Sequence, residues 1–141
     1  MITVYTDGAC SGNPGKGGWG VVILSNKDEI SLNGGDNNTT NNKMELTAAI
    51  EALKHFQKRE NITLITDSKY VKDGIQIWIK NWKKNNWKTS AKKPVKNKEL
   101  WIELDDLITR HNVSWEWVKG HAGNKYNEKA DDLARRYIEN I

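Results

Sequence analysis

Patterns of apolar and β-branched residues predict five short strands in this chain. Segments that are rich in β-branched and aromatic residues, or that alternate between apolar and polar positions, are typical of strands. The first segment is β-branched or aromatic at every position, which predicts a central strand covered on both faces. The five segments are residues 2–6, 19–24, 29–32, 62–66 and 113–118.

Apolar residues that recur every three or four positions predict four amphipathic helices. A polar stretch at residues 34–42 predicts a loop, and Asn41 or Asn42 is a suitable N-cap for the helix that follows. The order of the elements predicts an α/β fold in which a mixed sheet carries helices on its faces. The four helices cover residues 43–59, 68–80, 97–111 and 127–138.

Length and composition limit the class of protein. With 141 residues, the chain is predicted to form a single domain, residues 1–141. The one cysteine excludes an internal disulfide, so we expect a reducing compartment and a cytoplasmic location. No run approaches the roughly 20 apolar residues of a membrane span, and the start of the chain lacks a signal-peptide pattern. We therefore expect no association with a membrane.

Positive charge is concentrated in one segment, residues 80–98. This segment contains eight lysines and no acid, which leaves the rest of the chain at −4 of the total net charge of +4. Runs of charge are usually solvated surfaces. Here the lysines are interleaved with Trp82 and Trp87, and this combination favours a nucleic-acid contact.

The glycine-rich segment 15–20 matches the pattern G-x-G-x-x-G of dinucleotide-binding sites. That pattern has to open a helix, whereas this one opens a predicted strand, so we reject the dinucleotide interpretation. A phosphate-binding P-loop is also excluded, because Lys16 is followed by Gly17 instead of Ser or Thr. These glycines are expected to let the backbone turn tightly or approach a ligand closely.

Four acidic residues lie where the predicted elements could bring them together. Asp7 and Asp67 each follow a predicted strand, and Glu45 lies in the first turn of a predicted helix. The carboxyl ends of parallel strands form one edge, where ligands bind in open α/β sheets. Asp131 borders the apolar stripe of the last helix. Each position also has a structural explanation, because Asp favours turns and acids favour helix N-termini.

A cluster of four carboxylates would need cations, because bare carboxylates repel one another and raise each other's pKa. The ligands would all be oxygens, which suits Mg²⁺ or Mn²⁺ and argues against zinc. Two such ions, about 4 Å apart, can activate a water and stabilise the leaving oxygen of a phosphoryl displacement. Together with the basic segment, this chemistry indicates a polynucleotide backbone as the substrate.

Five motifs follow one another along the chain. They are Thr6-Asp7-Gly8-Ala9-Cys10 with Ser11-Gly12-Asn13-Pro14-Gly15, Thr40-Asn41-Asn42-Lys43-Met44-Glu45-Leu46, Thr66-Asp67-Ser68, Gly120-His121-Ala122-Gly123, and Asn127-Glu128 with Asp131. In this order and spacing, they resemble bacterial type 1 ribonuclease H (ribonuclease HI) over nearly the whole chain. The basic segment, with Trp-Lys-Lys at 82–84 and Trp-Lys-Thr at 87–89, also lies where this family carries one. The resemblance implies a ribonuclease H-like fold, whose mixed five-stranded sheet has the order 3-2-1-4-5 with strand 2 antiparallel, helices on both faces and a basic protrusion.

The resemblance implies an endonuclease that hydrolyses the RNA strand of RNA/DNA hybrids and leaves 5′-phosphate and 3′-hydroxyl ends. It implies that the cofactor is Mg²⁺, with two ions in the substrate complex, and that Mn²⁺ can substitute. His121 corresponds to a histidine that assists proton transfer or product departure. The metal-binding catalytic carboxylates would be Asp7, Glu45, Asp67 and Asp131.

The same resemblance assigns residues to the two strands of the hybrid. Asn13, Asn41 and Asn42 would detect the 2′-hydroxyls of the RNA strand, although asparagines also form turns and caps. Trp82 can equally be explained by core packing beside Trp78. The DNA strand would contact Thr40 and Asn97 at a phosphate, Tyr70, Trp82 and Ser90 at the deoxyribose, and lysines such as Lys83, Lys84 and Lys88 along the backbone.

Two other interpretations compete with a hybrid-specific endonuclease. Another nuclease, or a strand-transferase, of the same fold should lack the asparagines and the basic segment, and both are present. A non-catalytic hybrid-binding module should have lost a carboxylate, and all four are retained. We therefore expect the RNA/DNA hybrid as the partner, and a monomer with no obligate protein partner.

Overall fold

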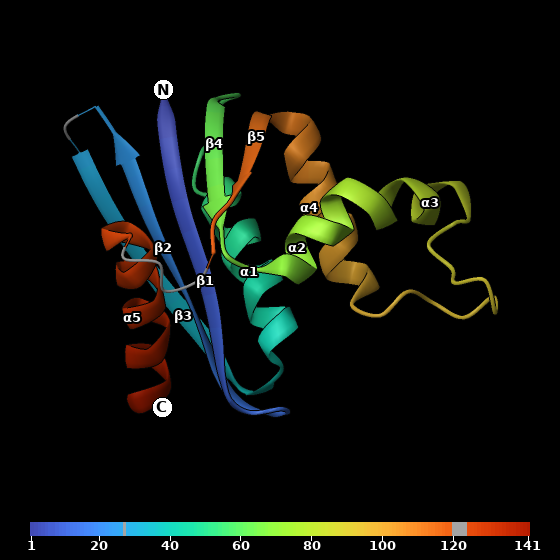
Figure 1. The fold of residues 1–141 in the computed structure, drawn as a ribbon, viewed down its shortest axis with the longest axis horizontal. Helices are drawn as coiled ribbons and strands as arrows, with labels where there is room; N and C mark the ends of the chain where they lie inside the picture. Colours follow the sequence, from blue (N-terminus) through green and yellow to red (C-terminus); the bar gives the residue numbers. More distant parts are fainter. Residues whose placement is uncertain (27, 120–123) are drawn as a thin grey trace.

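A five-stranded sheet forms the centre of the molecule in the computed structural model, which describes residues 1–26, 28–119 and 124–141. The strand order is β3-β2-β1-β4-β5 (Figure 1). Strands β1, β2 and β3 pair antiparallel, whereas β4 pairs parallel with both β1 and β5. The predicted mixed sheet and its order are therefore confirmed. The strands are β1 (Ile2–Gly12), β2 (Gly15–Ser25), β3 (Asp28–Thr39), β4 (Asn61–Thr66) and β5 (Asn112–Trp117).

Helices cover both faces of the sheet, as expected for an α/β fold. Helix α1 (Asn41–Lys54) packs on β1 and β2 and also contacts α4 (Lys98–Arg110). Helix α5 (Lys125–Glu139) crosses β1, β2 and β3 on the opposite face (Figure 1). None of the described helices is long and apolar enough to span a membrane.

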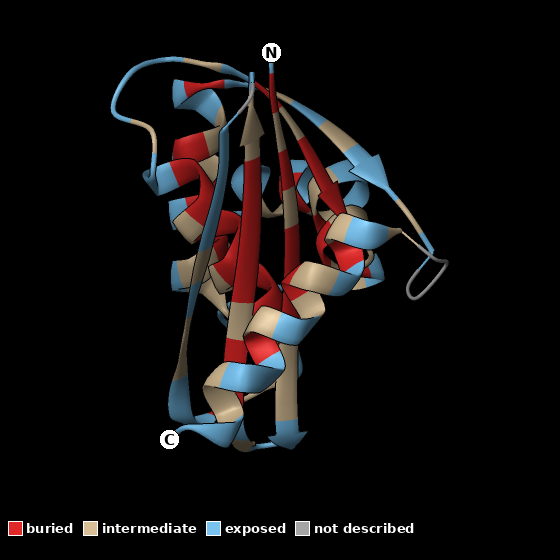
Figure 2. Cartoon of the chain, turned by 90° about the vertical axis from the view of Figure 1, so that its left-hand side faces the viewer, coloured by how far each residue is buried: buried red, intermediate tan, exposed pale blue. Residues whose placement is uncertain are grey.

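The hydrophobic core lies between the central strands and α1. Figure 2 shows buried residues along these strands, whereas β3 is exposed over most of its length. Val4, Leu46 and Leu64 are completely buried, and the indole of Trp101 from α4 completes this side of the core. The first predicted strand is therefore central and largely buried, as its β-branched composition predicted.

Strands β1, β2 and β3 are each several residues longer than the sequence predicted, and β2 begins at Gly15 instead of residue 19. The predicted loop at 34–42 is wrong over residues 34–39, because β3 continues to Thr39 by pairing with the glycine-rich start of β2. This pairing uses backbone groups, so it needs no apolar side chains. Strand β1 also continues past Asp7, since its pairing with β2 extends to Gly12. Asp7 is nevertheless the first residue beyond the parallel pairing of β1 with β4, which ends at Thr6.

Two predicted helices differ from the observed ones. Helix α1 starts and ends earlier than predicted, and its N-cap is Thr40, whose side chain accepts a hydrogen bond from the Lys43 amide at 3.2 Å. The helix predicted for residues 68–80 does begin after Ser68, which caps it. It continues to residue 84, and a five-residue π-helix interrupts it. Its three parts are α2 (Lys69–Asp73), η1 (Gly74–Trp78) and α3 (Ile79–Lys84).

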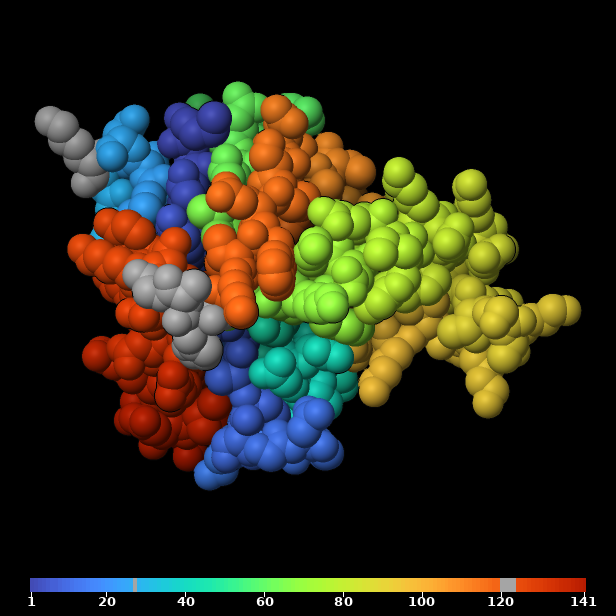
Figure 3. Space-filling model, viewed as in Figure 1, coloured from blue at the N-terminus to red at the C-terminus, as the bar shows by residue number. Residues whose placement is uncertain are grey.

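The basic segment 80–98 extends away from the rest of the molecule. Helix α3 and the chain that follows it form a protrusion on one side, seen in yellow in Figure 3. A short antiparallel bridge between Lys88 and Pro94 closes its loop. The indole of Trp87 packs against the ring of Trp82 at the base of the protrusion, with 6.3 Å between the ring centroids. The expected basic protrusion is therefore present.

Candidate active site

Asp7 occupies a buried position on the central strand. It is 4% exposed, and its Oδ1 accepts a hydrogen bond from the Gly8 amide at 3.0 Å. Its partner across the antiparallel pair is Gly20, so the Asp7 side chain lies on the face that α5 covers. A carboxylate held in the middle of a sheet is removed from most solvent, which disfavours its charged form.

Glu45 reaches Asp7 because α1 packs very closely on β1. A Cβ atom at Gly8 would lie only 2.5 Å from the backbone nitrogen of Glu45, so any larger residue at this position would push the helix away. Glu45 is 7% exposed, and its Oε1 is buried without a hydrogen-bond partner among the described residues. An orphaned carboxylate oxygen of this kind is uncommon in folded proteins and needs an explanation.

Asp67 completes a compact group of three carboxylates. It lies between the end of β4 and the start of α2, next to the point where β1 and β4 stop pairing. One carboxylate oxygen from each of Asp7, Glu45 and Asp67 can be chosen so that all three lie within 4.8 Å of one another. The structure thus brings together three acids that are 22 or more positions apart in the sequence.

The acids perturb one another's protonation. Burial, followed by the charges of Glu45 and Asp67, raises the pKa of Asp7 from 3.8 to about 10, and a hydrogen bond with Asp131 and its charge add to this shift. Burial and the charge of Asp67 likewise raise the pKa of Glu45 well above its ordinary value. The Asp7 carboxyl group therefore retains its proton at neutral pH when no cation neutralises it, and Glu45 binds its proton more tightly than an exposed glutamate does.

Asp131 approaches the group from α5. This helix also packs tightly, since a Cβ atom at Gly20 would lie 2.0 Å from the carbonyl oxygen of Ala130. The Oδ2 atom of Asp131 accepts a hydrogen bond from Nε of Arg135 at 2.9 Å and a second one from the same guanidinium. The glycine-rich start of β2 thus allows α5 to approach the sheet closely, whereas the sequence predicted a tight turn or a close approach to a ligand.

The donor set fits a hard divalent cation. All the candidate ligands are carboxylate oxygens, two of the acids are buried, and one oxygen of Glu45 has no partner within the described part of the chain. Mg²⁺ and Mn²⁺ prefer such oxygens, and the charge of a bound cation would offset the burial and the repulsion that raise the pKa values of Asp7 and Glu45. This site can hold a metal ion.

The asparagines predicted to contact RNA lie beside the N-terminus of α1. The Oδ1 atom of Asn13 accepts a hydrogen bond from the Asn41 amide at 3.2 Å, which ties the turn after β1 to the start of the helix. Thr40 caps the same helix, whereas Asn42 occupies its first turn. Glu45 lies one helical turn after Asn41 on α1, so these groups lie close along the helix to one of the carboxylates.

Tyr70 links the residues predicted to contact DNA. Its hydroxyl oxygen accepts hydrogen bonds from Nδ2 of Asn97 at 3.1 Å and from Nε1 of Trp101 at 3.0 Å. Asn97 precedes α4 in a left-handed conformation with φ of 60°. Trp82 is partly buried against Trp101 and the neighbouring Trp78, so core packing accounts for much of its environment.

The predicted lysine contacts are not equivalent. Lys83 forms an ion pair with Asp105 at 3.2 Å, whereas Lys84, Lys88 and Ser90 line an exposed hollow on the protrusion. Lys83 is also exposed, but a ligand phosphate would compete with Asp105 for its ammonium group. His121 and its glycine loop, residues 120–123, lie outside the described residues.

Sequence reasoning missed the residues that shape the acidic group. Arg135 binds Asp131 from one turn further along α5, and the spacing of four residues on a helix is the signal that could have identified it. The tight contacts at Gly8 and Gly20 have no comparable signal, because they depend on how closely two helices approach the sheet.

A sheet of this order with an acidic group at the end of its parallel strands defines the ribonuclease H-like class of proteins. Comparison with protein families finds a match to the model named RNase H over residues 1–139. The chain belongs to the RNase H family.

Curated relatives agree with this assignment. Ribonuclease H from Ehrlichia canis is 61% identical over 137 residues, which cover 97% of this chain and 94% of that protein. Ribonuclease HI from Neisseria meningitidis serogroup A is 59% identical and covers 96% of this chain and 93% of that protein. The chain is thus matched over nearly its full length by bacterial ribonucleases H.

Solved structures show the same fold. LC9-RNase H1, described as a type 1 RNase H with the type 2 active-site motif, is 33% identical and superposes with a TM-score of 0.88 over 99% of this chain and 72% of that one. RNase H1 from Halobacterium salinarum is 25% identical, with a TM-score of 0.75 over 99% of this chain and 98% of that one.

Proposed function

We propose that this protein is an endonuclease that hydrolyses the RNA strand of RNA/DNA hybrids and leaves 5′-phosphate and 3′-hydroxyl ends. The observation that carries the proposal is the group formed by Asp7, Glu45 and Asp67, whose oxygens lie within 4.8 Å of one another. Membership of the RNase H family supports hybrid as the substrate. The basic protrusion supports a nucleic-acid partner independently.

Mg²⁺ is the cofactor that we propose, with two ions in the substrate complex and Mn²⁺ as a substitute. Asp7, Glu45, Asp67 and Asp131 would hold it, and Asp7 is central because both Glu45 and Asp131 interact with its carboxyl group. Divalent ions at such a site supply an activated water and neutralise charge on the scissile phosphate. The carboxylates position this chemistry beside α1, where the RNA strand would lie.

Recognition of the RNA strand would depend on Asn13, Asn41 and Asn42. Their side chains lie at the start of α1, and amide groups can donate to and accept from the 2′-hydroxyls that distinguish RNA from DNA. Thr40 and Asn97 would bind a phosphate of the DNA strand. His121, which precedes α5 in the sequence, is proposed to assist proton transfer or product departure.

The protrusion would hold the DNA strand away from the reacting centre. Helix α2 begins two residues after Asp67 and leads through η1 and α3 into the basic segment, so the protrusion extends from the acidic edge. Tyr70, Trp82 and Ser90 would pack against deoxyribose, and Lys84 and Lys88 would contact phosphates. Lysine contacts of this kind add affinity without sequence specificity.

The experiment compares three labelled duplexes, RNA/DNA hybrid, RNA/RNA and DNA/DNA, each with Mg²⁺ or with EDTA. We expect cleavage of the RNA strand of the hybrid alone, and only with the metal. Asp7→Asn should abolish this cleavage. Asp132→Asn is the matched control, since Asp132 carries the same charge on α5 but is exposed and paired with Arg136.

Other outcomes would identify a different function. Cleavage of DNA duplex would indicate another nuclease of the same fold, and tight hybrid binding without cleavage would indicate a binding module. Appreciable Mg²⁺-dependent activity in Asp7→Asn would contradict the assignment of the carboxylates. We further propose that the protein acts as a cytoplasmic monomer, which sedimentation of the purified protein and fractionation of cells would test.

A further inference from the structure

Asp67 differs from its two neighbours in how its backbone is held. Asp7 lies inside β1 and Glu45 lies inside α1, so regular hydrogen bonding fixes both backbones. Asp67 lies in the two-residue connection between β4 and α2. The pairing of β4 with β1 and with β5 ends one residue earlier, at Thr66.

Just beyond Thr66, where the strand pairing ends, a side chain from β5 forms a hydrogen bond to the connection between β4 and α2. Nε1 of Trp117 donates a hydrogen bond to the carbonyl oxygen of Asp67 at 3.3 Å. The next residue, Val118, donates its amide to the carbonyl oxygen of Thr66 at 3.0 Å. The end of β5 therefore holds two successive carbonyl groups of the chain that leads to the Asp67 carboxylate.

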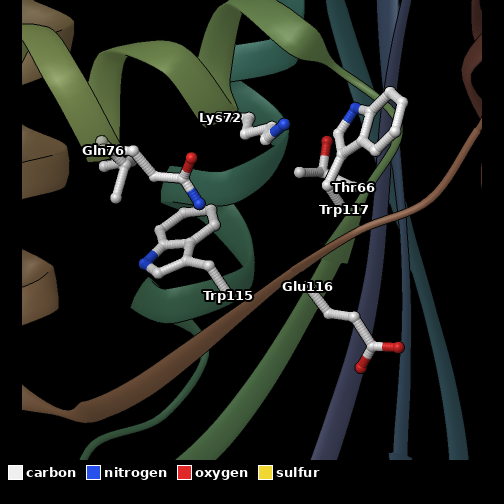
Figure 4. A pocket seen from close by; sticks show the side chains of 7 residues that line it. Thr66, Lys72, Gln76, Trp115, Glu116 and Trp117 are labelled. Carbon is white, nitrogen blue, oxygen red and sulfur yellow. The ribbon is translucent and has the colours of Figure 1, made fainter.

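The indole is itself held in place from α2. Nζ of Lys72 lies 4.8 Å from the centroid of the Trp117 ring, a distance typical of a cation–π contact. Figure 4 shows the Lys72 side chain directed towards this ring, with Thr66 beside it, at the edge of a small pocket between α2 and β5. Trp117 nevertheless remains 42% exposed, which is unusual for a tryptophan that serves only core packing.

We propose that Trp117 is a positioning residue, which orients the Asp67 carboxylate towards the metal through the hydrogen bond to its backbone. Partners that orient a metal ligand contribute strongly to affinity even though they do not touch the metal. This inference rests on the proposed function, because it takes Asp67 as a ligand. Lys72 supports the same orientation by fixing the ring.

The test measures Mn²⁺ affinity by calorimetry in the absence of nucleic acid. Trp117→Phe removes the N–H group and keeps an aromatic ring, and we expect the dissociation constant to rise roughly 3- to 10-fold. Trp115→Phe is the matched control, since Trp115 lies two residues earlier on β5 and lines the same pocket. We expect its affinity to stay within about 2-fold of the wild type.

The same substitution in an Asp67→Asn protein separates a positioning role of Trp117 from a general effect on the fold. If Trp117 acts through Asp67, then Trp117→Phe should change the Mn²⁺ affinity of an Asp67→Asn protein by less than about 2-fold. An equal loss in both backgrounds would overturn the proposal, as would an unchanged affinity in the wild-type background. Benzothienylalanine at position 117 exchanges the N–H for sulfur in a ring of the same size and should reproduce the loss, even if the phenylalanine variant folds poorly.

The result also distinguishes this inference from the proposed function. A wild-type protein that binds no Mn²⁺ would contradict the metal-dependent function and the positioning role together. A wild-type protein that binds Mn²⁺ and cleaves hybrid, with an unaffected Trp117→Phe variant, would contradict the positioning role alone.

Discussion

Replacing Asp7 by asparagine should stabilise the metal-free protein at neutral pH. The pKa of Asp7 rises from 3.8 to about 10 on folding, because the group is buried and surrounded by other acids. The folded state consequently binds more protons than the unfolded state between these values, and its stability falls as the pH rises through this window. Asparagine removes the titrating group and can still accept the hydrogen bond from Gly8.

The size of the effect follows from the pKa difference. Each pH unit between 3.8 and 7 contributes about 1.4 kcal/mol, which gives a ceiling of about 4 kcal/mol at pH 7. The buried amide offsets part of this gain, so we expect a stabilisation of about 1 to 4 kcal/mol at pH 7. At pH 4 the carboxyl group is largely protonated in the folded state and half protonated in the unfolded state, so the gain should fall below about 0.5 kcal/mol.

Urea unfolding in EDTA at pH 4, 5.5 and 7, monitored by circular dichroism, measures this pH dependence. Asp132→Asn serves as the control for the change in net charge, and we expect it to alter the unfolding free energy by less than about 0.5 kcal/mol at every pH. Destabilisation of Asp7→Asn at pH 7, or a stabilisation that does not shrink towards pH 4, would refute the reasoning.

Three other perturbations test different parts of the structure. Lowering the pH from 8 to 6 should weaken Mn²⁺ binding, because protons compete for the raised-pKa groups of Asp7 and Glu45; calorimetry at several pH values checks this, and a pH-independent affinity would contradict it. Alanine at both Lys84 and Lys88 should raise KM more than it lowers kcat, and it should reduce the slope of log KM against log salt by about 1 to 2. An unchanged slope would show that these lysines are solvated and do not contact phosphates of the substrate. Gly74→Ala should destabilise the fold by roughly 1 to 3 kcal/mol, since its Cβ would lie 2.0 Å from the buried Trp101 ring. Thermal unfolding measures this loss. A loss no larger than that of a control substitution at Ile77, an exposed residue of the same π-helix, would argue against the contact.

The sequence predicted the sheet well where side chains determine the pattern. The β-branched run at residues 2–6 and the apolar segment at 62–66 identify the central strands, because burial selects these residue types. It failed for residues 34–39, where glycines and polar residues extend β3 through backbone pairing. The π-helix at Gly74–Trp78 was also missed; its first residue, Gly74, lies against the Trp101 ring, a contact between distant residues that the local sequence does not reveal.

The candidate site was predictable in its residue types and only partly in its construction. Acids that follow parallel strands can be recognised from the order of elements, and this reasoning located Asp7 and Asp67. The contacts that assemble the group depend on distances between elements far apart in the chain. Gly20, for example, lies against the Ala130 carbonyl and so allows α5 to approach the sheet, and the hydrogen bond from Trp117 to Asp67 is equally invisible in the sequence.

The position of α5 has a consequence for how the protein becomes active during synthesis. This helix follows all five strands in the chain, covers β1, β2 and β3 on the face opposite α1, and carries Asp131. A nascent chain whose 15-residue α5 is still inside the ribosome would leave one face of its sheet uncovered and lack one of its acids. Nuclease activity would therefore begin only after α5 has left the ribosome and packed onto the sheet.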